Sequence, residues 1–240
     1  MDTVKFDKKQ TRMVAHRGLS GIECENTAAA FVAAGNRSYW GIETDVHSTA
    51  DGQYVVIHDT EAGMRVSDTN LNVEESTLEE IQAVWLKKPD TGESRTDFRI
   101  PTLAEYISIC KKYGKVAVTE LKTDFTEAQI SEILEIVDSY AYLESTVFIS
   151  FKWENLVKVK KLRPDQCVQF LCSAIDDAKI EELATYKMDL DISKSGLSEE
   201  LVKKIHEKGL EINCWTVDSP EEAAQYVAWG VDYITSNILE

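Results

Sequence analysis

The 240-residue sequence contains no apolar run that approaches the length of a membrane-spanning segment. Its first residues, MDTVKFDKKQ, also lack the apolar core that a secretory signal peptide carries. These two absences lead us to expect a cytoplasmic protein that does not insert into a membrane.

Positive charge is scarce as well. The chain carries 26 lysines and arginines against 42 aspartates and glutamates, which gives a net charge of −16. Because nucleic acids and anionic membrane surfaces both attract a basic protein face, both are disfavoured as partners. We expect a small-molecule substrate instead, and if it is anionic, local cations or a metal ion must overcome the acidic background.

The cysteines suggest neither disulfides nor a zinc site, because their number, five, is odd and no two of them form a CxxC pair. Cys24 lies near a His-Arg pair, but we expect it to be a small buried apolar residue rather than a catalytic thiol.

What the chain does contain is a regular alternation of short β-branched runs and amphipathic stretches, which predicts a parallel sheet covered by helices. The predicted strands are residues 12–16, 41–46, 115–121, 146–151, 166–171, 188–192, 210–217 and 231–235. Eight such strands in this length favour an α/β fold of the closed (β/α)8 TIM-barrel type. The alternative is a doubly wound open sheet, which usually carries a G-x-G-x-x-G motif that this sequence lacks.

Two segments depart from this alternation. The sequence VHSTADGQYVVIH at 46–58 predicts a β-hairpin that extends the second strand and turns at Asp51-Gly52. A turn centred on these two residues would place His58 opposite Asp45. Residues 60–101 are then a small insertion within a single domain of residues 1–240, with a helix over Ser76–Trp85 that Ser76 and Glu79 begin as a capping box.

Polar residues gather at the predicted carboxyl ends of the strands, where barrels of this type carry their active sites. They are His16, Arg17, Glu43, Asp45, His58, Glu120 and Lys122. Three carboxylates in one cavity repel each other, so either some are protonated or a cation neutralises them, and all-oxygen ligands favour Mg²⁺ or Ca²⁺. A salt-bridge network of the carboxylates with Arg17 and Lys122 is the alternative, and the two interpretations are compatible.

The remaining groups suggest acid–base chemistry on a phosphate. His16 and His58 would supply a general acid and a general base at neutral pH, with the assignment between them open. Arg17 and Lys122 would bind the non-bridging oxygens of the phosphate. The other two histidines, His47 and His206, are assigned no role.

A set of short motifs, in order and over nearly the whole chain, closely resembles the glycerophosphodiester phosphodiesterase family of the phosphatidylinositol-phospholipase-C-like superfamily. The motifs are His16-Arg17-Gly18, Glu25-Asn26-Thr27, Glu43 to His47, Thr49 to Asp59, Ile100 to Leu103, Glu120 to Lys122 and Trp215 to Val217. The resemblance implies a barrel enzyme that hydrolyses a glycerophosphodiester, such as glycerophosphocholine or glycerophosphoethanolamine, to sn-glycerol 3-phosphate and an alcohol.

The resemblance also implies residue roles. Glu43, Asp45 and Glu120 would hold one divalent cation. His16 and His58 would act as acid and base, Arg17 and Lys122 would hold the phosphate, and Trp215 would line the glycerol pocket. The implied reaction is substrate-assisted, because the neighbouring glycerol hydroxyl attacks phosphorus and water then opens the resulting cyclic phosphate. Relatives often carry an aspartate at Asn237, and we expect this departure to affect a structural contact only.

Three other functions remain as alternatives at this stage. A phospholipase of the C or D type would use the same groups but needs an apolar or basic face for lipid aggregates. A phosphate-binding barrel without catalysis would usually lack a histidine or a metal-ligand carboxylate. A metal-dependent sugar isomerase would not carry the His-Arg-Gly arrangement. The alcohol head group and assembly into a homo-oligomer are left open by the sequence.

Overall fold

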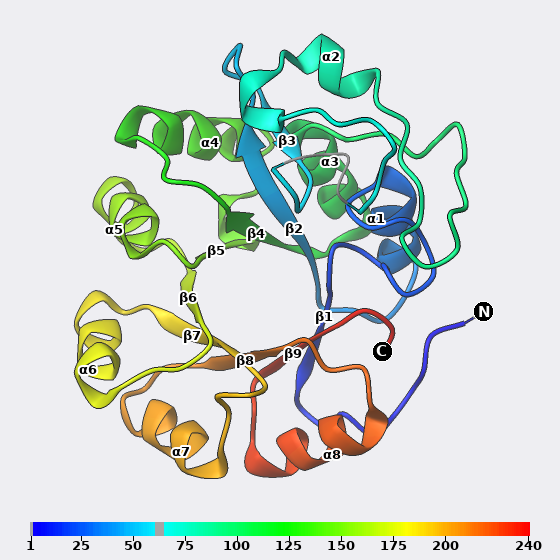
Figure 1. The fold of residues 1–240 in the computed structure, drawn as a ribbon. Helices are drawn as coiled ribbons and strands as arrows, with labels where there is room; N and C mark the ends of the chain where they lie inside the picture. The colour runs from blue at the N-terminus through cyan, green and yellow to red at the C-terminus, as the bar shows by residue number, and fades with distance from the viewer. Residues whose placement is uncertain (1, 61–64) are drawn as a thin grey trace.

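The computed structural model describes residues 2–60 and 65–240, and its central feature is a closed ring of eight parallel strands (Figure 1). The strands are β1 (Arg12–Ala15), β2 (Gly41–Ser48), β4 (Val116–Leu121), β5 (Thr146–Ser150), β6 (Val168–Cys172), β7 (Asp189–Ser193), β8 (Ile212–Trp215) and β9 (Tyr233–Ser236). The ring closes because β1 pairs with both β9 and β2, with Val14 opposite Gly41 and Ala15 opposite Ile42. The predicted TIM barrel is therefore confirmed, and the doubly wound open sheet is excluded.

Seven helices surround the ring and connect its strands (Figure 1). They are α1 (Ala28–Gly35), α3 (Leu103–Tyr113), α4 (Glu127–Ser139), α5 (Trp153–Leu162), α6 (Asp177–Tyr186), α7 (Glu199–Glu207) and α8 (Pro220–Trp229). A side-chain cap begins most of them; at α8, the hydroxyl of Ser219 accepts a hydrogen bond from the N–H of Glu222 and Pro220 occupies the first helical position. Among the described residues, no helix is long and apolar enough to cross a membrane.

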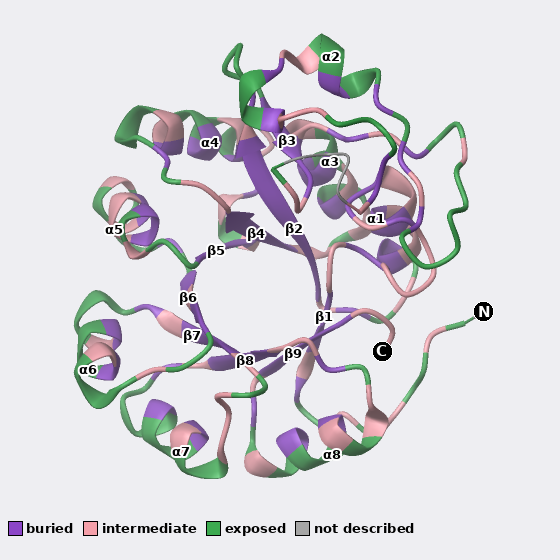
Figure 2. Ribbon diagram, viewed as in Figure 1, coloured by how far each residue is buried: buried purple, intermediate pink, exposed green. Residues whose placement is uncertain are grey.

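Apolar side chains form two layers around the strands, and Figure 2 shows the strands and the inward helix faces as buried. The larger layer lies between the barrel and its helices. A smaller one fills the interior of the barrel and is made of Val14, Val118, Val147, Ile149, Leu171 and Tyr233. Because this inner layer closes the barrel from below, polar groups at the upper strand ends lie on an apolar floor.

The hairpin forms as predicted, with β3 (Tyr54–Val56) antiparallel to β2, but its predicted register is wrong by one residue. Ser48 pairs with Tyr54, and the N–H of Ile57 donates to the carbonyl oxygen of Asp45 at 2.9 Å, so Ile57 and not His58 lies opposite Asp45. The cause is a three-residue connection, 50–52, closed by a hydrogen bond from the N–H of Thr49 to the carbonyl of Gln53 at 2.8 Å.

The insertion after the hairpin contains a 3₁₀ turn, η1 (Val73–Glu75), and one short helix, α2 (Leu78–Gln82); a second 3₁₀ turn, η2 (Leu143–Ser145), lies outside it. The predicted capping box is shifted by one residue, because Thr77 and Glu80 form it. Ser76 is engaged elsewhere, since its hydroxyl donates to the carbonyl of Asn72 at 2.7 Å.

Buried apolar residues of this insertion pack on the hairpin and on Cys24, which is fully buried as expected. Burial raises the pKa of the Cys24 thiol to about 12, so the thiol stays protonated at neutral pH and is a poor nucleophile.

Candidate active site

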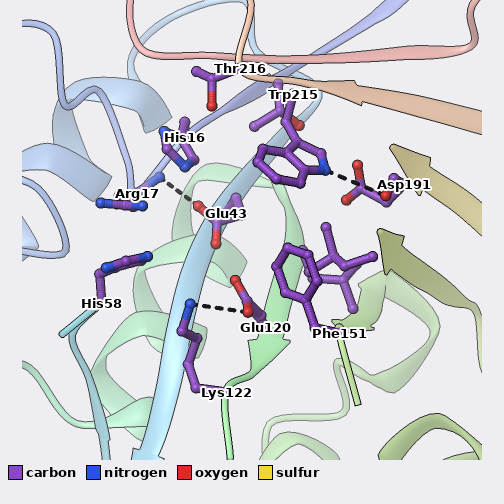
Figure 3. Close-up of a pocket in the computed structure, with 13 residues that line it drawn as sticks. His16, Arg17, Glu43, His58, Glu120, Lys122, Phe151, Asp191, Trp215 and Thr216 are labelled. Atoms are coloured by element: carbon purple, nitrogen blue, oxygen red, sulfur yellow. Dashed lines mark hydrogen bonds and ion pairs between the residues drawn. The ribbon is translucent and has the colours of Figure 1, made fainter. Parts of the chain in front are cut away.

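A pocket of about 470 Å³, including its open mouth, lies at the carboxyl ends of the barrel strands (Figure 3). Seven of the eight residues singled out in the sequence line this pocket, namely His16, Arg17, Glu43, His58, Glu120, Lys122 and Trp215. The eighth, Asp45, is only 1% exposed and lies against two of them, Arg17 and Lys122. The fold thus brings together residues that are up to 199 positions apart in the sequence, here His16 and Trp215.

The His-Arg-Gly turn after β1 is held by tight backbone packing. Arg17 and Gly18 both have left-handed backbones, with φ of 53° and 74°. A side chain at Gly18 would place its Cβ 2.7 Å from atoms of Ala30, so only glycine fits there. The turn also aims the N–H of Arg17 at the carboxylate of Glu43, at 2.7 Å, which fixes β1 and β2 relative to each other at the pocket.

The three carboxylates form one buried cluster. Asp45 and Glu120 are direct neighbours across β2 and β4, and Glu43 lies two residues before Asp45 on the same face of its strand. Each of the three offers an oxygen, and these oxygens lie within 4.8 Å of one another.

The electrostatics of this cluster call for extra positive charge. Burial, together with the charges of Asp45 and Glu120, raises the pKa of Glu43 well above its ordinary range. Burial and Asp45 likewise raise the pKa of Glu120 to about 8. The donor set is entirely oxygen, as Mg²⁺ and Ca²⁺ prefer, so the cluster fits one divalent cation.

Two protein cations already touch the cluster. The Lys122 ammonium lies 3.3 Å from Asp45 and 3.1 Å from Glu120, and Arg17 Nε lies 3.6 Å from Asp45. Burial works against ionisation of Asp45, but Lys122 and Arg17 outweigh it and hold the pKa of this carboxyl below its usual range. The predicted salt-bridge network therefore exists beside the carboxylate cluster, and neither cation forms an ion pair with Glu43 among the described residues.

Residues of the Glu25-Asn26-Thr27 motif support this arrangement from behind. Asn26 donates to Asp45 at 2.7 Å and accepts from the hydroxyl of Thr44 at 2.7 Å. Glu25 lies between two guanidinium groups, 2.9 Å from Arg17 and 2.7 Å from Arg65. The motif thus orients a cluster carboxylate and Arg17, a role that the sequence did not reveal.

His16 is held in one orientation by Asn237. Its Nδ1 lies 2.8 Å from Asn237 Oδ1, and Asn237 Nδ2 donates to the carboxylate of Asp218 at 2.6 Å. Because Asp218 only accepts, the amide nitrogen must face it and the amide oxygen must face His16. His16 therefore carries its proton on Nδ1 and keeps Nε2 free as an acceptor, and Asn237 orients a side chain of the pocket.

The two histidines differ in their environments. Burial and the neighbouring Arg17 lower the pKa of His16 to about 4. Burial, with the charges of Arg17 and Lys122, also lowers the pKa of His58, whereas Asp45 and the Asp59 carboxylate, whose Oδ1 is 2.7 Å from His58 Nδ1, favour its charged form. An amide thus faces His16 and a carboxylate faces His58.

The side of the pocket away from these cations is aromatic and apolar (Figure 3). The rings of Phe151 and Trp215 meet edge to face, with centroids 5.7 Å apart, and Ile149 and Leu171 lie beside them. One carboxyl, that of Asp191, also lines this side, and sequence reasoning missed it.

The histidines that received no role lie outside the pocket. His47 is buried 3.2 Å from Glu74, and His206 lies 2.9 Å from Asp232 on the far side of the barrel wall. Neither contact involves a residue of the pocket, so both histidines are assigned to the fold.

Comparison with known proteins agrees with this geometry. Residues 16–239 match a family model described as "Glycerophosphoryl diester phosphodiesterase family". A glycerophosphodiester phosphodiesterase of Caldanaerobacter subterraneus subsp. tengcongensis is 31% identical over 240 residues, which cover 95% of this chain and 94% of that protein.

Two solved structures are similar over almost their whole length. A phosphodiesterase of Oleispira antarctica, in complex with the product sn-glycerol-3-phosphate, is 26% identical with a TM-score of 0.80, covering 98% of this chain and 96% of that one. A glycerophosphodiester phosphodiesterase of Parabacteroides distasonis is also 26% identical with a TM-score of 0.80, covering 95% and 93%.

Proposed function

Because the chain belongs to the glycerophosphoryl diester phosphodiesterase family, as its motifs indicated, we propose that it hydrolyses glycerophosphodiesters to sn-glycerol 3-phosphate and an alcohol. It is an enzyme of this family, and we propose glycerophosphocholine and glycerophosphoethanolamine as the type of substrate. The observation that carries the proposal is one pocket lined by two histidines, two cations and two carboxylates, Glu43 and Glu120, of a three-membered cluster. The bound product in the Oleispira relative supports the same substrate class.

Glu43, Asp45 and Glu120 would hold one divalent cation, Mg²⁺ or Ca²⁺. Such an ion would supply positive charge for the phosphate and would make a nearby hydroxyl more acidic. Arg17 and Lys122 would bind the non-bridging phosphate oxygens, and their pairing with Asp45 holds both side chains ready at the edge of the cluster.

We assign the base to His16 and the acid to His58. The free Nε2 of His16, held neutral opposite an amide, would take the proton of the glycerol hydroxyl next to the phosphate. The hydroxyl oxygen then bonds to phosphorus, the bond to the alcohol breaks, and His58 donates a proton to the leaving oxygen. The Asp59 carboxylate and the bound phosphate anion would both favour the protonated state of His58. Water would then open the cyclic phosphate with the two roles exchanged.

The alternatives are less well supported. A phosphate-binding barrel without catalysis would usually lack a histidine or a metal-ligand carboxylate, and this chain keeps all of them. The net charge of −16 disfavours binding to the lipid aggregates that a phospholipase engages. We further propose that residues 1–240 act as one catalytic domain in the cytoplasm, on a small molecule.

A coupled assay for glycerol 3-phosphate tests this function directly. We expect release of glycerol 3-phosphate from soluble glycerophosphodiesters with different head groups, and much slower reaction of micellar lysophospholipids. Faster reaction of the micellar lipids would favour the phospholipase alternative, and no reaction with any diester in the presence of Mg²⁺ or Ca²⁺ would contradict the proposed function.

A change at Asn237 should alter the pH dependence. The pKa of His16 is lowered to about 4, and the base must be deprotonated to act. The double substitution Asn237→Asp with Asp218→Asn keeps the number of carboxylates but moves one beside His16, which raises its pKa. The acid limb of kcat/KM should therefore move to higher pH, by about one unit.

The single variant Asp218→Asn is the control for this experiment, because it removes the distant charge without placing one against His16. An acid limb that stays in place in the double variant would show that another group controls it.

A further inference from the structure

The carboxyl of Asp191 has no evident role in the fold. It projects from β7 into the pocket and is only 2% exposed. Its Oδ1 has no hydrogen-bond partner, and no arginine or lysine pairs with it, among residues 2–60 and 65–240. A buried carboxyl oxygen without a hydrogen-bond partner is costly, and such groups are rare in folded proteins.

The residues around Asp191 do little to stabilise its buried carboxyl. Ile149 and Leu171 are nearly buried apolar neighbours in the pocket lining. The indole of Trp215 donates at 3.4 Å to the backbone oxygen of Asp191, not to its carboxyl. Burial and the charge of Glu120 raise the pKa of Asp191 well above its ordinary range, although the side chain of Asn213 acts in the opposite direction. Oδ1 of Asp191 still lacks a hydrogen-bond partner among residues 2–60 and 65–240.

The charge pattern of the pocket shows which part of a substrate can reach this carboxyl. Arg17 and Lys122 lie on the side of the carboxylate cluster, and Figure 3 shows Asp191 across the pocket from both, beyond Trp215. A phosphate anion would bind near the two cations, across the pocket from Asp191. The partner of Asp191 is thus a group on one side of the phosphate, not the phosphate itself.

The pocket is closed beside Asp191 and open at its rim, and this difference indicates which part of the substrate, the glycerol or the alcohol, lies on each side of the phosphate. Asp191, Ile149 and Leu171 are 2–4% exposed, whereas Phe151 at the rim is 45% exposed. The alcohol varies among glycerophosphodiesters and must leave after the first step, which suits the open rim. The glycerol is small and constant, which suits the closed part beside Asp191.

We propose that Asp191 binds the terminal hydroxyl of the substrate glycerol and thereby restricts the enzyme to fully deacylated glycerophosphodiesters; this inference rests on the proposed function. A hydroxyl both donates and accepts, so it can pair with the carboxyl in either protonation state. An acyl ester at the same position has no O–H to donate and adds bulk where the pocket is closed. A substrate without that hydroxyl would leave Oδ1 of Asp191 buried and unpaired, and a buried polar atom left unpaired discriminates strongly against such an analogue.

Three substrates and three variants test the proposal. The substrates are glycerophosphoethanolamine, its analogue without the terminal hydroxyl, and its analogue with that hydroxyl acetylated; all keep the attacking hydroxyl. For the unmodified enzyme we expect kcat/KM to fall by about 10²-fold or more for either analogue. In Asp191→Ala the parent and the deoxy analogue should react within about threefold of each other, because the pairing that separates them is gone.

Two further variants control for charge and folding. Asp189→Asn removes a carboxyl two residues away on the same strand and outside the pocket, so it should keep the discrimination of the unmodified enzyme. Asp191→Asn keeps shape and hydrogen-bonding capacity, so it should retain part of the discrimination and unfold in urea at a concentration no lower than the unmodified enzyme. If Asp191→Ala does not fold, the intermediate discrimination of Asp191→Asn is the deciding measurement.

The outcomes separate this inference from the proposed function. Failure to release glycerol 3-phosphate from the parent substrate would contradict the proposed function itself. Hydrolysis of the parent with undiminished discrimination in both Asp191 variants would overturn the inference alone. A changed preference between ethanolamine and uncharged head groups, without any change in the hydroxyl effect, would place Asp191 at the head group and would also overturn it.

Discussion

Replacement of His16 by alanine, and separately of His58, is expected to lower kcat by about 10²–10⁴-fold, because each removes one proton-transfer group from the reaction. Both side chains line the pocket, and their contacts with Asn237 and Asp59 are local, so the free energy of unfolding should change far less. Steady-state release of glycerol 3-phosphate and urea unfolding measure the two effects.

The matched control for these variants is His206→Ala. His206 pairs with Asp232 outside the pocket, so its loss should leave kcat close to that of the unmodified enzyme. Activity near the unmodified level in His16→Ala or His58→Ala would make that histidine a structural residue.

A substrate with a good leaving group distinguishes the two roles. With glycerol phospho-p-nitrophenol, which keeps the attacking hydroxyl, the leaving group needs little help from an acid. His58→Ala should therefore recover much of its lost rate on this substrate, whereas His16→Ala should not, because the hydroxyl still has to lose its proton. The opposite pattern would exchange the two roles.

Periodicity predicted the barrel well because its signal is local. Every predicted strand is present, with ends shifted by no more than two residues, since alternation of β-branched and amphipathic segments is repeated along the chain. The errors arose where one residue decides the outcome. The hairpin register depended on whether Asp51-Gly52 was the whole connection, and a third loop residue moved His58 by one position.

The sequence predicted residues that the fold brings together at one pocket, but it did not predict their interactions. His16 and Asn237 are 221 positions apart, and no local pattern announces their contact. Asp191 belongs to an alternating Asp-Leu-Asp-Ile segment of β7, which indicates its face on the strand but not that its Oδ1 has no hydrogen-bond partner within the described part of the chain. Contacts between distant segments depend on how the barrel closes, so only the folded structure reveals them.

Removal of divalent cations is expected to abolish glycerol 3-phosphate release, and Mg²⁺ or Ca²⁺ should restore it. The reason is the crowding of Glu43, Asp45 and Glu120, whose oxygens lie within 4.8 Å of one another while Lys122 and Arg17 pair only with part of the cluster. Full activity after exhaustive chelation would contradict a metal role.

The stability of the protein gives a second measurement that does not depend on activity. A cation that binds only the folded state shifts urea unfolding to higher concentration, by an amount that grows with the cation concentration. Glu43→Gln and Glu120→Gln should reduce this shift, whereas Glu200→Gln, on the exposed face of α7, should leave it intact. Without cation, Glu43→Gln should be at least as stable as the unmodified protein, because it removes one of three mutually repelling buried carboxylates. A loss of stability in that variant at every cation concentration would instead mean that Glu43 serves the fold, through its bond to the N–H of Arg17, and not a metal ion.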